Sequence, residues 1–162
     1  MTFKKAVETS TPPLNMAYQL GMQALGDYSK KIKCARKPNE TITGSVDLDS
    51  TLARLPEFAS ANRWDYGLGY LPKKGKECAV WIEVHGAKDK EIGTITRKVK
   101  WLKTYLPQYA PKLWAMTLDS PDELRYVWIS TNSGLSTRHT KNFRQAAQEG
   151  ILMKPVSVLT LP

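Results

Sequence analysis

One apolar run that contains two polar residues constrains this chain more than any other segment. Residues 79–86 read AVWIEVHG, a composition that predicts a β-strand. Because side chains alternate across a strand, Glu83 and His85 share one face with Trp81. A carboxylate buried in such a strand is costly unless it is paired, hydrogen-bonded or bound to a cation. The run therefore predicts a polar, buried site on one strand of a sheet.

Further carboxylates lie in the two segments before this run. A strand is predicted at residues 63–71, which contain Asp65, and the turn at 72–76 joins it to the strand at 79–86 as a hairpin. If the hairpin places Asp65 beside Glu83, the two carboxylates suit Mg²⁺ or Mn²⁺, which leave most of their coordination shell to water and phosphate. Asp47, in a strand predicted at 41–49, is a candidate third ligand.

Hydrophobic spacing and turn residues predict the other elements. Helices are expected at residues 14–34, 91–106 and 140–149, with a short one around 52–58, and further strands at 112–118, 125–130 and 156–161. Residues 1–12 lack periodicity, so a flexible arm is expected before a single domain over 13–162. The order predicts a mixed α/β (α+β) fold, with helices flanking a central mixed sheet.

The charge balance points to a polyanionic partner. Lysine and arginine number 24 against 15 acidic residues, which gives a net charge of +9 and makes nucleic acid, DNA or RNA, the expected partner. The candidates for phosphate contact are Lys73, Lys74, Lys76, Lys88, Arg97, Lys100 and Lys103. The alternative is an ordinary solvated surface. Trp101 is expected to pack rather than to stack on bases, since no exposed aromatic row accompanies it in the sequence.

Cysteine usage and hydropathy bear on the compartment. Cys34 and Cys78 lie far apart and outside any CxxC pattern, which favours free thiols in a reducing cytoplasm. No apolar stretch reaches the length of a membrane span, and the N-terminus does not read as a signal peptide. Walker, GxGxxG, HExxH and zinc-type Cys/His patterns are not found in the sequence.

The arrangement of motif and elements resembles the PD-(D/E)XK, or restriction-endonuclease-like, nuclease superfamily over about residues 14–118. Asp65 matches the motif aspartate and Glu83 the motif glutamate, whereas His85 occupies the lysine position and Trp64 the position of the proline. The resemblance implies a restriction-endonuclease-like core and hydrolysis of phosphodiester bonds in DNA or RNA. It also implies Mg²⁺ or Mn²⁺ held by the two carboxylates.

Three residues are candidates for the role of the missing lysine. His85 ranks first, because its pKa lies near neutrality and it could position water or carry a proton. Lys98 ranks second, because it borders the apolar stripe of the helix at 91–106, to which some members of the superfamily move this lysine. Lys88, after the strand, ranks third.

Two other functions remain open from the sequence. One is a catalytically inactive nucleic-acid-binding module that keeps the fold, and the other is a protein-interaction module. A homodimer is a further alternative for the partner. For Glu83 and His85 themselves, the alternative to a functional site is a buried polar pair in which each satisfies the other.

Overall fold

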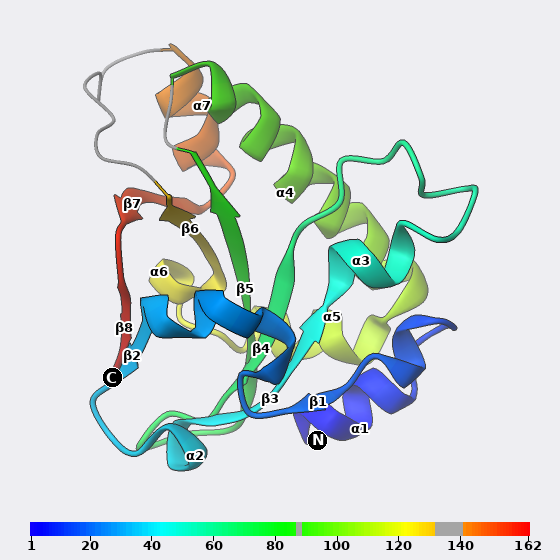
Figure 1. The fold of residues 1–162 in the computed structure, drawn as a ribbon, viewed down its shortest axis with the longest axis vertical. Coiled ribbons are helices and arrows are strands. Elements are labelled where there is room, and N and C mark those ends of the chain that lie inside the picture. The colour runs from blue at the N-terminus through cyan, green and yellow to red at the C-terminus, as the bar shows by residue number, and fades with distance from the viewer. Residues whose placement is uncertain (87–88, 132–140) are drawn as a thin grey trace.

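The structure is a computed structural model that describes residues 1–86, 89–131 and 141–162. Within these residues, six strands form one mixed sheet in the order β1-β3-β4-β5-β6-β7 (Figure 1). The strands are Gln19–Leu20 (β1), Ile42–Asp47 (β3), Tyr66–Tyr70 (β4), Cys78–His85 (β5), Tyr126–Ser130 (β6) and Ile151–Val156 (β7). The predicted mixed fold, with a central mixed sheet and flanking helices, is confirmed at this level.

Two kinds of connection build the sheet. Strands β3, β4 and β5 form an antiparallel meander, while β6 runs parallel to β5 and β7 runs parallel to β6. Parallel neighbours need long crossovers. Between β5 and β6 these are the helices Asp89–Tyr109 (α4), Pro111–Leu118 (α5) and Asp122–Arg125 (α6), and between β6 and β7 the helix Lys141–Gln148 (α7).

Helices cover one face of the sheet. Helices α4 and α5, together with the N-terminal helix Phe3–Glu8 (α1), enclose a core that contains Trp64, Trp81 and Trp128, none of which has exposed surface. In Figure 1, α4 runs along the sheet as the longest helix. Its apolar stripe points into this core, so any residue beside the stripe lies close to the strands.

The opposite face packs against shorter elements. A 3₁₀ segment, Gln23–Lys31 (η2), and a parallel pair formed by Ile32–Cys34 (β2) and Leu159–Leu161 (β8) cover an aliphatic core. Val80, Ile82 and Val84 of β5 point into it, whereas Trp81 belongs to the helical side. The alternation predicted for residues 79–86 is therefore confirmed.

The prediction of a flexible arm over residues 1–12 is wrong. Residues 3–8 form α1, with Thr2 as its N-cap, and Phe3, Ala6 and Val7 have no exposed surface. These three positions follow the i, i+3, i+4 spacing of one helix face. The segment is too short for its periodicity to be read from the sequence, and tertiary packing stabilises it.

The single helix predicted at residues 14–34 is also wrong. The segment divides into a 3₁₀ turn at Leu14–Met16 (η1), then β1, η2 and β2. Gly21 and Gly26 interrupt it with positive φ angles of 56° and 52°, a left-handed conformation that ends helical hydrogen bonding. The spacing of apolar residues does not indicate where a glycine with positive φ ends a helix.

The strand predicted at 112–118 is wrong as well, since these residues form most of α5. Pro111 begins the helix, and Leu113, Met116 and Thr117 form its buried side. The short helix expected around 52–58 lies earlier, at Leu48–Leu52 (α3), and the final strand expected at 156–161 is divided into β7 and β8. A four-residue helix, Pro38–Thr41 (α2), precedes β3.

The remaining predictions hold within a few residues. The helix expected at 91–106 is α4, the strand at 125–130 is β6, and the helix at 140–149 corresponds to α7. The sequence TNSG at residues 131–134 also predicts a loop, of which only Thr131 lies within the described residues. In the described part of the chain, no helix has the length and apolar character needed to cross a membrane.

Candidate active site

Two carboxylates and one ammonium group meet where the β4–β5 hairpin faces α4. Asp65 directly precedes β4, and Glu83 belongs to β5. Lys98 lies near the middle of α4. Lys98 Nζ lies 2.9 Å from Asp65 Oδ1 and also donates to Glu83 Oε1. One cation from the helix therefore bridges the two carboxyl groups that the resemblance singles out.

The register of the hairpin brings the carboxylates together. Tyr66 pairs with Ile82 across the antiparallel strands, so the next position places Asp65 beside Glu83. The Asp65 N–H donates to Glu83 Oε2 at 3.2 Å, and the Val84 N–H donates to Asp65 Oδ2 at 3.0 Å. With the two bonds from Lys98, every carboxylate oxygen of the pair accepts a hydrogen bond, which fixes both side chains.

Burial and charge shift the acidity of the site. The Glu83 side chain has no exposed surface, and loss of solvation, together with the neighbouring Asp65 charge, raises the pKa of Glu83 to about 8 despite the opposing effect of Lys98. Burial opposes the charge on Lys98, but attraction by Glu83 and Asp65 outweighs it, so the pKa of the ammonium group is raised. Near neutral pH the group thus keeps a charged lysine beside a carboxyl that readily takes up a proton.

Solvent reaches two of the three residues in this group. The side chains of Asp65 and Lys98 are 20% and 15% exposed, in contrast to the fully buried Glu83. A ligand would therefore meet Asp65 and Lys98 first, and it could reach Glu83 only by displacing or sharing the Lys98 contact.

His85 has a different partner. Its Nε2 lies 2.9 Å from Glu91 Oε2 on α4, its backbone carbonyl accepts from Trp128 Nε1, and its side chain is 38% exposed. The first-ranked candidate for the lysine role is thus engaged by α4, and the second-ranked Lys98 is the residue that contacts both carboxylates. The alternative of a closed Glu83–His85 pair does not describe the structure, because Lys98 and the Asp65 N–H bond the Glu83 oxygens.

Asp47 does not join the pair. It is the N-cap of α3, where its Oδ1 accepts from the Ser50 N–H at 2.8 Å, and it lies opposite Tyr66 in the register, on the face of the sheet away from Glu83. Among the residues that the structure describes, no group of three or more His, Cys, Asp or Glu side chains is arranged to hold a metal ion. The predicted third ligand is therefore absent from the described site.

The basic residues predicted to bind nucleic acid are dispersed. Lys73, Lys74 and Lys76 are exposed in the β4–β5 turn, at the end of the hairpin opposite Asp65 and Glu83. Lys88 lies outside the described residues. Arg97 is exposed on α4, one residue before Lys98. Arg97 thus adjoins Lys98 on α4, whereas the whole length of β4 separates the hairpin lysines from Asp65.

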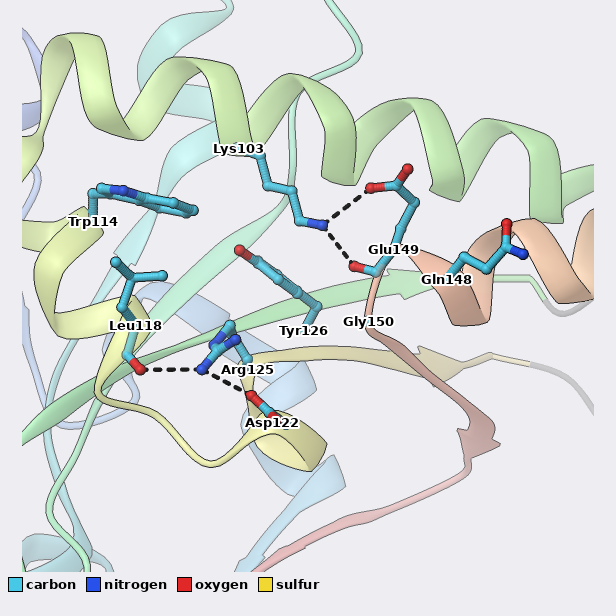
Figure 2. A pocket seen from close by; sticks show the side chains of 9 residues that line it. All are labelled: Lys103, Trp114, Leu118, Asp122, Arg125, Tyr126, Gln148, Glu149 and Gly150. Carbon is cyan, nitrogen blue, oxygen red and sulfur yellow. Dashed lines mark hydrogen bonds and ion pairs between the residues drawn. The ribbon is translucent and has the colours of Figure 1, made fainter.

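The last two basic residues of this set turn toward α7. Lys103 Nζ lies 2.8 Å from the Glu149 carbonyl oxygen and 3.0 Å from its Oε2, and Lys100 lies 3.6 Å from Oε1. Figure 2 shows Lys103 at the rim of a hollow of about 500 Å³ that Trp114 and Tyr126 also line. The charged residues that line this hollow are paired: Lys103 with Glu149, and Arg125 with Asp122 at 2.9 Å. This hollow does not include the Asp65–Glu83–Lys98 group.

Comparison of the chain with protein-family models, curated proteins and solved structures finds no match. The candidate site consequently rests on geometry. Sequence reasoning found all three residues but ranked Lys98 below His85. The available signal was its position at the edge of the apolar stripe of α4, which directs a long side chain toward the strands.

Proposed function

We propose that this protein is a metal-dependent phosphodiesterase of restriction-endonuclease-like fold that cleaves DNA or RNA. The observation that carries the proposal is the contact of Lys98 with both Asp65 and Glu83. A fully buried carboxyl with a pKa near 8 beside a second carboxylate and a lysine is a combination that functional sites favour and that ordinary packing rarely needs.

The topology supports the same proposal. The resemblance implies the order helix, three-strand meander, helix, strand, and the meander β3-β4-β5 followed by α4 keeps the middle of that order. The helix expected at 14–34 and the strand expected at 112–118 are not formed, so β6, parallel to β5, would take the place of the last strand. The two carboxylates lie on neighbouring strands of that meander, and the lysine comes from the helix after it. If Lys98 takes the role of the motif lysine, residue 85 does not need to be a lysine, and histidine can stand there.

Asp65 and Glu83 are the residues that would hold Mg²⁺ or Mn²⁺. The donor set fits, because such ions need one or two carboxylates and take their other ligands from water and phosphate. When bound, the ion would polarise the phosphate and lower the pKa of a bound water. Lys98, released from one carboxylate, would donate to a phosphate oxygen or orient the attacking water, and Asp65 keeps its orientation through the Val84 N–H.

A cleavage assay tests the proposal. Single- and double-stranded DNA and RNA are incubated with the protein in Mg²⁺, Mn²⁺ or EDTA, beside Asp65→Asn and Glu83→Gln variants. We expect metal-dependent cleavage of at least one substrate, with a loss of 100-fold or more in each variant. Asp49→Asn is the matched control, because the Asp49 side chain pairs with Arg63 at 2.9 Å, and its one contact with the candidate site, from its backbone N–H to the Asp65 carbonyl oxygen, is kept in the variant. Full metal-dependent activity in Glu83→Gln would falsify the proposal.

The second candidate is a catalytically inactive module of the same fold that binds nucleic acid. One observation favours it: the Lys98 ammonium group lies between the two carboxyl groups, in the position that a metal ion would need. In that case a gel shift that weakens steeply with salt would appear without cleavage in any metal. The free thiols of Cys34 and Cys78 support a cytoplasmic location for either function.

A further inference from the structure

An aromatic column follows α4 on the side of the candidate site. The ring of Tyr105 stacks on Trp101 at 4.9 Å and 19°, and on Tyr109 at 5.0 Å and 22°. The spacing i, i+4, i+8 places the three rings in one row along the helix. Trp101 packs against the core, as the sequence predicts, and Tyr105 in the middle of the column is buried, so the row is not an exposed one. The stacking of the three rings on one another is the feature that the structure adds.

The loop between α3 and β4 fixes the column from one side. Phe58 meets Trp101, Tyr105 and Tyr109 edge-on, at centroid distances of 6.2, 5.4 and 5.4 Å. Arg63 holds this loop by donating to the carbonyl oxygens of Phe58 and Ala59. The rings are therefore held in place before any ligand arrives, which lowers the entropic cost of stacking on them.

Trp101 is the end ring of the column, and it lies near Lys98. Tyr105, in the middle, is 3% exposed, whereas Trp101 is only partly buried. Trp101 follows Lys98 by three positions, which are neighbours on a helix surface, and helical side chains lean toward the N-terminal turn. Tyr105 stacks on one side of the Trp101 ring. A ligand ring that stacked on the opposite side of Trp101 would therefore lie toward the helical turn that carries Arg97 and Lys98.

We propose that Trp101 stacks on an unpaired nucleobase adjacent to the phosphate that Lys98 contacts. The inference rests on the proposed function and specifies its substrate class as single-stranded nucleic acid. Bases inside a duplex already stack on each other, so a protein ring can extend a stack only at an unpaired or splayed base. Arg97, exposed four residues before Trp101, is placed to contact the backbone of the same strand.

Binding of two oligonucleotides in EDTA tests the inference without cleavage. One is a single-stranded DNA of mixed sequence, and the other has the same length with abasic sites in place of its bases. We expect the first to bind the wild-type protein about tenfold more tightly, a factor that corresponds to one stacked base. In Trp101→Leu the two oligonucleotides should bind equally, while Trp101→Phe, which keeps a ring, should restore most of the preference.

Tryptophan fluorescence supplies an independent readout. Trp64, Trp81 and Trp128 are fully buried, so the partly buried Trp101 and Trp114 are the residues whose emission a base could quench. Quenching by the base-containing strand should persist in Trp114→Leu and disappear in Trp101→Leu. Trp114 is the matched control because it lies beside the separate hollow of Figure 2.

The outcomes separate this inference from the function on which it rests. If the wild-type protein binds and cleaves nucleic acid but does not distinguish the abasic strand, the stacking inference alone is overturned. If it binds neither oligonucleotide, both are overturned. Should Trp101→Leu fail to fold, the comparison of Trp101→Phe with the wild-type protein and the abasic preference of the wild-type protein still decide the matter.

Discussion

Lys98 donates a hydrogen bond to Glu83, a carboxyl group that has no exposed surface. The contact joins the middle of α4 to the middle of the sheet, and it occurs beside Asp65, whose Oδ1 lies 2.9 Å from the same Nζ. Breaking a buried pair by removing one partner is more damaging than replacing both, because it leaves a charge without compensation. The behaviour of the site thus depends on whether Glu83 is ionised.

Substitution of Lys98 by methionine should separate activity from stability. We expect cleavage to fall by 100-fold or more, and the protein to remain folded at pH 6, where Glu83 can stay protonated. Loss of Lys98 raises the pKa of Glu83 further, so at pH 9 the folded variant must either hold a proton that the unfolded chain has released or bury an unpaired charge. The variant should therefore lose about 3 kcal/mol of unfolding free energy relative to wild type at pH 9. Urea denaturation at the two pH values measures the difference.

Lys100→Met is the control for this substitution. Lys100 lies on the same helix but contacts Glu149, at 3.6 Å, and its side chain is exposed. Its stability change should be within about 0.5 kcal/mol and should not differ between the two pH values. Equal losses in the two variants at pH 9 would contradict the assigned role of Lys98.

Glu83 should also make the stability of the protein depend on pH. Its pKa rises from an ordinary value of 4.5 to about 8 in the folded state, so between these values the folded protein binds a proton that the unfolded chain has released. Stability therefore falls as pH rises from 4.5 to 8. Thermal or urea denaturation across this range should show a shallower decline in Glu83→Gln, whereas Glu57→Gln, at an exposed position, should follow wild type.

Binding of Mn²⁺ should release a proton below pH 8. A carboxylate must be deprotonated to coordinate a metal, and Glu83 holds a proton in much of the population at neutral pH. Affinity should consequently rise with pH up to about 8 and then level off. Calorimetry in two buffers of different ionisation enthalpy measures the released proton, and its absence at pH 7 would count against Glu83 as a ligand.

The strand pattern of residues 79–86 was sufficient to predict the face and the burial of Glu83. A period of two is a local property, and it survives any tertiary arrangement. The partner of Glu83 was harder to predict, because His85 lies on the same strand and Lys98 on the helix that follows it. The choice between them depends on how α4 lies across the sheet, which alternation and spacing do not determine.

The same limit explains the larger errors in the fold. Residues 112–118 suit a strand by composition, but Pro111 begins a helix whose buried side completes the core above β5. Residues 3–8 are too few to show a period, yet Phe3 packs close to Gly69 of β4. In both segments tertiary contacts outweigh local preference.

Gly67 of β4 should not tolerate a side chain. A Cβ at this position would lie 2.8 Å from Trp81 Cζ3 and 3.1 Å from Val46 Cγ2, both in the fully buried core. Gly67→Ala should therefore destabilise the protein by about 1–3 kcal/mol, the usual cost of overpacking. Gly93→Ala is the matched control: its nearest neighbour would be 3.6 Å away, and alanine in a helix should stabilise by about 0.5–1 kcal/mol. Denaturant midpoints of the two variants should move in opposite directions.

Substitution of Asp47 should affect stability, whereas substitution of Asp65 should affect Mn²⁺ affinity. Asp47 caps α3 through the Ser50 N–H, so Asp47→Ala should cost about 1 kcal/mol of stability and leave Mn²⁺ affinity unchanged. Asp65→Asn keeps the shape of the side chain but removes a negative charge beside Glu83, which lowers the pKa of that carboxyl and should reduce Mn²⁺ affinity at least tenfold. Calorimetric titration measures both. If Asp47→Ala weakened Mn²⁺ binding as strongly as Asp65→Asn, the metal would lie nearer β3 than the Lys98 contact implies.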